Sequence, residues 1–292
     1  MIRKALFGGA LLVAAACATV RPASSPIGGA VAAASSRCGC RIGVAAKHLE
    51  SGRSYEHLAD SEFEGASVTK IAVLTEAMAQ AREGSIDLSQ RWEMSEAEKA
   101  DGSGLLQMLD PGLEPTWNDL LTLMIGPSDN TATNAWIGRL GLEPINARME
   151  SLGFSHIRLL GTIPPLSRRE EEPSAWKGLR FGALTPRDVA LWYEQVAGGL
   201  LLDPDSSRRI FEYLDKDPSR LRVARRFPPE DLWAGKTGSM SGVRNDSGIL
   251  RTKKGRFVLV IFTDGSKASG GNAADHPSVL AITDVAKAIV DT

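Results

Sequence analysis

The stretch that decides the fold is DLWAGKTGSMSGVRNDSGILRTKKGRFVLVIFTD, which occupies residues 231–264. Three segments within it, 231–238, 245–251 and 256–263, have the composition of strands and are separated by short turns that contain glycine. The last two are joined through Lys253-Lys254-Gly255. Strands with such short connections pair antiparallel, because a parallel pair needs a long crossover. The sequence therefore predicts an antiparallel sheet in this part of the chain.

Further elements are expected on either side of this stretch. Residues 40–49 predict one more strand, followed by a turn. Helices are predicted at 30–34, at 67–81, from Thr116 to Gly126-Pro127, directly after Asn130, at 189–197 behind the Thr185-Pro186-Arg187-Asp188 cap, and at 277–290. One strand, a helical middle, then strands and a helix cannot form a parallel βαβ repeat.

This order of elements predicts an α+β fold, in which an antiparallel β-sheet flanked by helices stands beside an all-helical domain. We expect residues 30–66 and 205–292 to form the sheet domain, and residues 67–204 to form the helical domain as an insertion. A cleft between two such domains is the default place for an active site.

The amino terminus has the pattern of an export signal. Two basic residues precede the uncharged run 5–16, and Cys17 follows three alanines. The pattern predicts a signal peptide over residues 1–16 and a linker over residues 17–29. It resembles a bacterial lipoprotein processing site, at which Cys17 is lipidated, with ordinary cleavage as the alternative. We expect an exported, periplasmic protein, which is anchored to the bacterial envelope if Cys17 carries a lipid.

Export also bears on the other two cysteines, Cys38 and Cys40. An oxidising compartment permits disulfides, but a bond between these two residues closes a very short ring. We expect two small buried or paired thiols at a strand edge rather than a redox site.

Composition excludes several classes of function. The 292 residues include 34 basic and 35 acidic side chains, for a formal net charge of −1, which leaves no electrostatic case for binding nucleic acid. The four histidines, His48, His57, His156 and His276, lack metal-ligand spacing, and no phosphate-binding glycine loop or Gly-x-Ser-x-Gly motif is present. We expect no metal and no cofactor, and nothing demands more than a monomer.

Ser67-Val68-Thr69-Lys70 stands at the predicted start of a helix, where residues three apart share a face. The Lys70 amine can then lie against the Ser67 hydroxyl and take its proton, while the backbone N–H at the positive helix end can hold an oxyanion. Alone the pattern is weak, because a capping serine with a solvated lysine has the same spacing. The chain contains a second copy of the pattern, Ser174-Ala175-Trp176-Lys177, so the spacing of serine and lysine alone does not identify a catalytic site.

Two more short motifs carry suitable chemistry. Ser128-Asp129-Asn130 falls in the break between two helices, where a serine can relay a proton and an asparagine amide can bind a carbonyl or an ammonium. Lys236-Thr237-Gly238 falls on a predicted strand, where lysine offers a charge to an anion and glycine permits close approach. Each motif alone is equally consistent with ordinary turn or surface chemistry.

The three motifs together, in this chain order, resemble the signature of class A serine β-lactamases and penicillin-binding proteins. The resemblance covers residues from about Ser36 to Asp291 and is stronger to class A than to the longer transpeptidases. It implies a β-lactamase/transpeptidase-like fold, with a β-lactam as the small-molecule substrate. It also implies that Ser67 is the acylated nucleophile, Lys70 its proton partner, and Ser128 the group that passes a proton to the leaving lactam nitrogen.

The resemblance also assigns substrate contacts. Asn130 would bind the substrate side-chain amide, and Lys236 and Thr237, with the adjacent Gly238, would bind its carboxylate. The backbone N–H groups of Ser67 and Ser239 would form the oxyanion hole. Arg244 stands where many class A enzymes place a second carboxylate-binding cation, although a solvated strand arginine has the same appearance.

One family feature is missing. Class A enzymes carry a deacylating glutamate in a Glu-x-x-Leu-Asn pattern, which this sequence lacks. Glu170 and Glu172 are the candidates, with a solvated acidic face as the alternative. If neither acts, the protein is a penicillin-binding DD-peptidase or esterase with slow or absent deacylation, or a non-catalytic envelope lipoprotein. Substrate preference depends on loop geometry near Met240-Ser241 and near 101–106, which the sequence does not determine.

Overall fold

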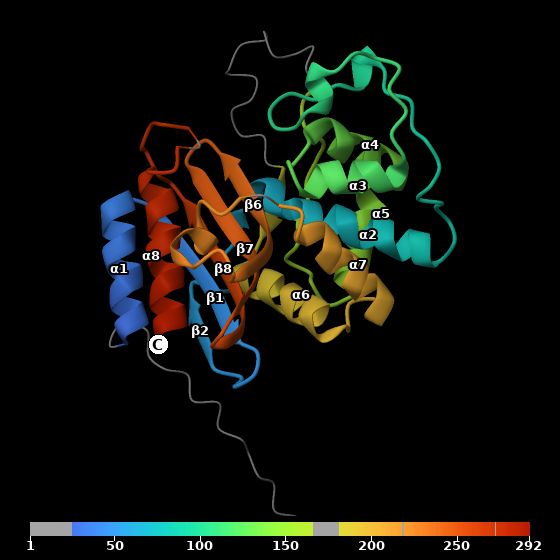
Figure 1. Cartoon of the computed structure of the whole chain (residues 1–292). Coiled ribbons are helices and arrows are strands. Elements are labelled where there is room, and N and C mark those ends of the chain that lie inside the picture. The colour runs from blue at the N-terminus through green and yellow to red at the C-terminus, as the bar shows by residue number, and fades with distance from the viewer. Residues whose placement is uncertain (1–24, 166–180, 218, 272) are drawn as a thin grey trace, which may run out of the picture.

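The computed structural model describes residues 25–165, 181–217, 219–271 and 273–292. Its centre is a five-stranded antiparallel sheet with the order β2-β1-β8-β7-β6 (Figure 1). The strands are β1 Arg41–His48, β2 Ser54–His57, β6 Leu232–Met240, β7 Val243–Thr252 and β8 Gly255–Asp264. The predicted antiparallel sheet is confirmed, including its early strand, which pairs with β8 in the register Val44↔Ile261.

The two hairpins depend on glycines in the left-handed region. Gly255 has φ +119° at the turn between β7 and β8, and Gly242 has φ +69° at the turn between β6 and β7. A side chain is strained at such angles, so glycine is the natural residue at both corners. The resulting register places Lys236 opposite Ser247 and Thr237 opposite Asp246.

Side-chain alternation along the strands gives the sheet two apolar faces. Val258 and Val260 of β8 join the core shared with the helical layer, whereas Leu259 and Ile261 join the core under the terminal helices. These helices, α1 Pro26–Cys38 and α8 Pro277–Asp291, lie side by side on one face (Figure 1). The helix α6 Pro186–Gly198 packs on the other face, behind the Thr185 cap that the sequence predicted.

The first helix begins earlier than expected, inside the segment 17–29 predicted as a linker. Ser25 accepts a hydrogen bond from the Gly28 N–H at 3.0 Å, and Pro26 occupies the first helical position. This cap is a normal helix start, and it outweighs the low helix propensity of the two glycines that follow.

The remaining helices form a layer beyond the opposite face of the sheet from α1 and α8. They are α2 Lys70–Arg82, α3 Trp117–Ile125, α4 Asn130–Leu140, α5 Leu142–Ser151 and α7 Pro204–Leu214. The predicted helix start at Thr116 is confirmed, and Thr116 and Asp119 form a capping box there. Trp136 and Trp192 are fully buried in this core. Helix α7 begins at the predicted domain boundary and packs against α2, α3 and α6.

Helices α5 and α7, strand β2 and a small second sheet were not predicted from the sequence. That sheet has the order β3-β5-β4, with β3 Phe63–Glu64, β5 Gly182–Leu184 and β4 Arg158–Leu159. Strands this short carry no periodicity, so only the tertiary fold defines them. Among the described residues, no helix combines the length and apolar character needed to cross a bilayer.

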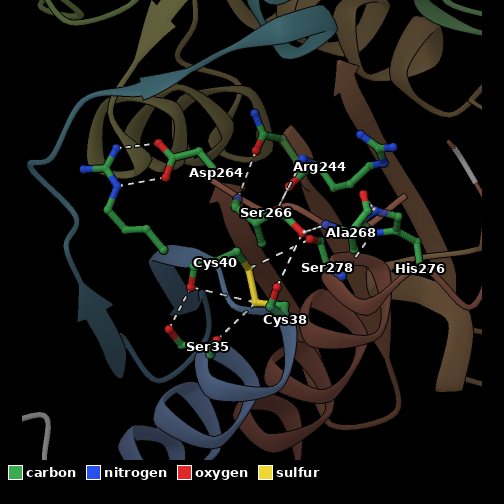
Figure 2. Close-up of a disulfide and its surroundings, with 12 residues drawn as sticks. Ser35, Cys38, Cys40, Arg244, Asp264, Ser266, Ala268, His276 and Ser278 are labelled. Carbon is green, nitrogen blue, oxygen red and sulfur yellow. Dashed lines mark hydrogen bonds and ion pairs between the residues drawn. A yellow bond between two sulfur atoms is a disulfide. The ribbon is translucent and has the colours of Figure 1, made fainter. Parts of the chain in front are cut away.

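Figure 2 shows a disulfide between Cys38, the last residue of α1, and Cys40, directly before β1. Gly39 between them has φ +57°, which lets the helix end and the strand begin within one residue. Ser266 Oγ donates to the Cys38 carbonyl at 3.4 Å. The two cysteines are thus buried and paired, which is one of the two states expected from the sequence.

Candidate active site

Ser67 lies in a short 3₁₀ turn, Ala66–Thr69, that leads directly into α2. Ala66 has φ +44°, an unusual value for a residue with a side chain. Ser67 is partly exposed, whereas Lys70, the first residue of α2, is fully buried. The turn therefore presents the serine at the surface and directs the lysine inward.

The same turn packs against β6 at Gly238. A Cβ atom on Gly238 would lie 2.8 Å from the Gly65 carbonyl oxygen and 3.2 Å from the Val68 side chain. Glycine at this position lets the Lys236-Thr237-Gly238 strand approach the serine turn closely. The first and third motifs are thereby brought into contact.

Lys70 connects the first motif to the second. Its ammonium donates to the Ser128 carbonyl at 2.7 Å, to Ser128 Oγ at 3.2 Å and to Asn130 Oδ1 at 2.8 Å. Among the described residues, no hydrogen bond joins Lys70 Nζ to Ser67 Oγ, although the spacing of the motif predicted that contact. Ser128 itself has φ +61°, which turns its carbonyl and hydroxyl toward the lysine.

The Lys70 environment favours the neutral amine. Burial lowers the pKa of Lys70 well below its ordinary value, and the positive charge of Lys236 lowers it further. The Asp129 carboxylate opposes these two effects. A lysine with a lowered pKa can act as a proton acceptor near neutral pH.

Asp129 holds the second motif in place. Its carboxylate accepts from the Ala132 N–H at 2.9 Å, which caps α4, and from the Leu105 and Leu106 N–H groups at 2.6 and 2.8 Å. The Asn130 side-chain amide donates to the Asp101 carbonyl at 2.7 Å. The loop 101–106, which was expected to shape the pocket, is thus tied directly to the second motif.

Lys236 is fully buried and lies near two carboxylates. Its ammonium donates to the Thr237 carbonyl at 3.1 Å. Burial lowers the pKa of Lys236 and the charge of Arg222 lowers it further, whereas Asp217 and Asp246 oppose the fall. The negative charges therefore favour retention of the lysine proton.

Sequence reasoning missed Arg222. Its guanidinium donates to the Gly238 carbonyl at 2.8 Å, to the Asn245 carbonyl and to Ser239 Oγ, so it lies directly against the strand of the third motif. No local spacing links Arg222 to this strand, because the contact exists only after the chain before β6 folds back onto the sheet. Asp217 was missed for the same reason, whereas Asp246 lies on β7 opposite Thr237 and was overlooked although the hairpin places it there.

Arg244 has a different environment. Its guanidinium donates to the carbonyls of Met240 at 2.6 Å and Val243 at 2.5 Å, and to the Gly271 carbonyl. Burial lowers its pKa. The predicted second cation is thus engaged with backbone carbonyls, while Arg222 contacts Ser239.

Glu170, Glu172 and the second Ser-x-x-Lys copy at 174–177 lie outside the described residues, as does Cys17. Within the described residues, no group of three or more His, Cys, Asp or Glu side chains could hold a metal ion. The site consists of serine, lysine, asparagine, arginine and aspartate side chains around a buried junction. Such a set suits nucleophilic attack and proton transfer.

A mixed sheet-and-helix fold with these three motifs in contact defines the superfamily of serine β-lactamases and penicillin-binding proteins. Within it, the chain belongs to the beta-lactamase enzyme family, whose model matches residues 28–292.

One curated relative and two solved structures are similar to this chain. The chain is 28% identical over 294 residues to a β-lactamase of Streptomyces lavendulae, with 92% of each chain covered. It is 31% identical to a crystal structure of a β-lactamase from Sphaerobacter thermophilus DSM 20745, with a TM-score of 0.80 and coverage of 91% of this chain and 96% of that one. The protein PBP-A, at 24% identity, shares the fold with a TM-score of 0.78 over 93% of this chain and 96% of its own.

Proposed function

We propose that this protein is a serine β-lactamase that opens the β-lactam ring of penicillin- or cephalosporin-type antibiotics through an acyl-enzyme on Ser67. The observation that carries the proposal is the set of hydrogen bonds from the buried Lys70 ammonium to Ser128 and Asn130, at the end of the turn that carries the partly exposed Ser67. Membership of the beta-lactamase enzyme family supports the same reaction.

Acylation needs a nucleophile and a path for its proton. In the proposed step, neutral Lys70 accepts the proton of Ser67 as Oγ attacks the lactam carbonyl carbon, and the backbone N–H groups of Ser67 and Ser239 hold the oxyanion. As the carbon–nitrogen bond breaks, Ser128 gives its hydroxyl proton to the leaving nitrogen and regains one from Lys70. The 3.2 Å contact between Lys70 Nζ and Ser128 Oγ supports this relay.

Substrate recognition is assigned to the edge formed by the third motif. Lys236 and Thr237 would bind the substrate carboxylate, beside a second cation. Arg244 is the candidate from the sequence, but the contact of Arg222 with Ser239 makes Arg222 the stronger one. Asn130 would bind the side-chain amide of the substrate.

Deacylation requires a base that activates water, and we assign it to Glu170 or Glu172. If neither glutamate acts, the acyl-enzyme persists, and the protein is a penicillin-binding DD-peptidase or esterase. The absence of the Glu-x-x-Leu-Asn pattern favours this second candidate, and the fold shared with PBP-A is compatible with it. A non-catalytic envelope lipoprotein is the third candidate.

The amino-terminal pattern supports export to the periplasm, with lipidation of Cys17 as the route to an envelope anchor. Mass spectrometry of the mature amino terminus tests this part. A diacylglyceryl cysteine as the first residue supports the anchor, and a free amino terminus at another residue contradicts it. We expect a monomer, which light scattering checks.

The central test combines a nitrocefin time course with intact mass after mixing the protein with benzylpenicillin. Multiple turnovers support the lactamase, and a stable adduct without turnover supports the penicillin-binding protein. Ser67→Ala should abolish both signals, while Ser174→Ala, which changes the second Ser-x-x-Lys copy, should keep the adduct. Retention of covalent labelling in the Ser67→Ala variant would refute the proposal.

If turnover is observed, Glu170→Gln and Glu172→Gln identify the deacylation base. The variant that lacks the base should accumulate the penicillin adduct at an unchanged acylation rate. Rapid turnover in both single variants and in the double variant would contradict the assignment.

A further inference from the structure

A cavity of about 360 Å³ lies on the face of the sheet that α1 and α8 cover, away from the catalytic motifs. It opens where α1 begins and α8 ends, above β1, β2 and β8. Its volume falls within the range of small-molecule sites in proteins.

The walls of the cavity are apolar and come from five elements. Ala46 of β1 pairs with Tyr55 of β2, so that both side chains are on this face, and Phe257 of β8 lies beside them. Ile27 of α1 and Ile289 of α8 close the space from the helical side. Because Ala46 is small, the strand leaves room that its neighbours do not fill.

Two polar groups at this cavity lack enough partners. The Tyr55 side chain is 8% exposed, and its hydroxyl is buried without a hydrogen-bond partner among the described residues. A buried hydroxyl of this kind is costly unless a ligand or water satisfies it. Burial raises the pKa of Tyr55, so the hydroxyl stays protonated and available as a donor.

The second group is the Arg53 guanidinium at the mouth. Its Nη1 donates to the Thr292 carbonyl at 3.1 Å, while Nε and Nη2 make no hydrogen bond within the described part of the chain. Two other polar side chains of the lining already have partners: His48 bonds through both ring nitrogens, to Ser51 and to the Lys254 carbonyl, and Lys47 pairs with Glu194. The Arg53 guanidinium therefore has two nitrogen atoms left to donate at the opening.

We propose that this cavity binds a small organic anion with an apolar, aromatic or short alkyl body. The body would fill the space between Ile27, Ile289 and Phe257, and a carboxylate or sulfonate head would accept from Arg53 and from the Tyr55 hydroxyl. The site is separate from the acyl-enzyme chemistry, and it does not depend on the proposed lactamase activity.

The test uses 8-anilinonaphthalene-1-sulfonate, an aromatic anion whose fluorescence rises when it leaves water. The mature protein should show one saturable site. Arg53→Gln should weaken binding about tenfold, as expected for loss of a hydrogen bond to a charged group, and Tyr55→Phe about threefold. Ile289→Trp should fill the cavity and remove the saturable signal.

Arg91→Gln is the matched control, because Arg91 is also exposed and also donates through Nη1 to a single backbone carbonyl, that of Glu114 at 2.6 Å. The Arg91→Gln variant should bind 8-anilinonaphthalene-1-sulfonate with the wild-type affinity. Thermal unfolding shows whether each variant is folded. If Ile289→Trp does not fold, the affinities of the Arg53→Gln and Tyr55→Phe variants test the proposal. Absence of a saturable site, equal affinity in all variants, or loss of the probe after acylation by benzylpenicillin would overturn the proposal.

Discussion

Lys70 and Lys236 are both fully buried, and burial lowers the pKa of each. Their surroundings nevertheless differ. Lys70 donates to neutral oxygens of Ser128 and Asn130, and the positive charge of Lys236 lowers its pKa more than the Asp129 carboxylate raises it. Lys236 lies near the Asp217 and Asp246 carboxylates, which resist the loss of its proton.

This difference shows that burial alone does not assign a role to a lysine. A lysine held by neutral acceptors and repelled by a second cation gives up its proton readily, which suits a proton carrier. A lysine balanced by carboxylates keeps its charge, which suits an anion-binding group. The two lysines of one site can therefore have opposite tasks although their exposure is the same.

Charge-conserving substitutions of Lys70 and Lys236 should reveal the largest difference, in the rate of acylation. Arginine cannot release its proton near neutral pH, so Lys70→Arg should slow acylation by about a thousandfold, within the range for loss of a general base. Lys236→Arg keeps the charge at the anion site and should cost about tenfold or less, mainly in KM. Stopped-flow acylation by nitrocefin measures both variants.

Thermal unfolding must first show that both arginine variants are folded. Equal losses of acylation rate in the two variants would contradict the division of tasks between the lysines. A Lys70→Arg variant that acylates at the wild-type rate would exclude Lys70 as the base.

The sequence predicted the parts of this site that are local in the chain. The spacing of Ser67 and Lys70, the helix start at Thr116 and the strand that carries Lys236 all depend on neighbouring residues. The hydrogen bonds of Lys70 were not predictable in detail, because the positive φ of Ser128 and the approach of the second motif arise from tertiary packing. Arg222 has no local signal at all.

The short strands β3, β4 and β5 were missed for a related reason. Two or three residues have no hydrophobic period, and they become strands only when distant segments meet, as Glu64 and Ala183 do. Helices with strong caps were found, except α7, whose Asp203 cap and first-turn Pro204 were overlooked. Local rules therefore recover elements with caps or periods, and tertiary contacts supply the others.

Asp246, which lies near Lys236, should have a smaller effect, on the pH dependence of the protein's stability. Burial raises the pKa of Asp246 to about 7, although Arg222 and the Val223 N–H oppose the rise. Between about pH 4 and 7 the folded protein thus holds a proton that the unfolded chain has released. Stability should fall as the pH rises through this window, by up to about 4 kcal/mol, and Asp246→Asn should remove that part of the fall.

Urea unfolding at pH 5 and pH 8 measures this difference. Asp110→Asn, at an exposed aspartate, is the control and should follow the wild-type curve. If Asp246→Asn loses as much stability between the two pH values as the wild type does, Asp246 is not the group that titrates, and its influence on Lys236 must be constant across the range.

Substitutions of Arg222 and Arg244 give the smallest expected effect on activity. They show which of the two arginines binds the substrate carboxylate. Arg222 contacts Ser239 beside Lys236, so Arg222→Gln should lower kcat/KM for benzylpenicillin by 10- to 100-fold, which is about 1.4 to 2.8 kcal/mol for a lost charged hydrogen bond. Arg244→Gln should change it by about twofold at most, because the Arg244 guanidinium already donates to the Met240 and Val243 carbonyls.

Arg222 also bonds to the Gly238 and Asn245 carbonyls, so its loss can disturb the strand itself. Benzylpenicillin methyl ester separates the two effects, because it lacks the negative charge that the cation would bind. If Arg222 recognises the carboxylate, Arg222→Gln should slow acylation by the acid and leave acylation by the ester at the wild-type rate. An equal loss with both substrates would mean that Arg222 positions the strand, and Lys236 would then carry the anion alone.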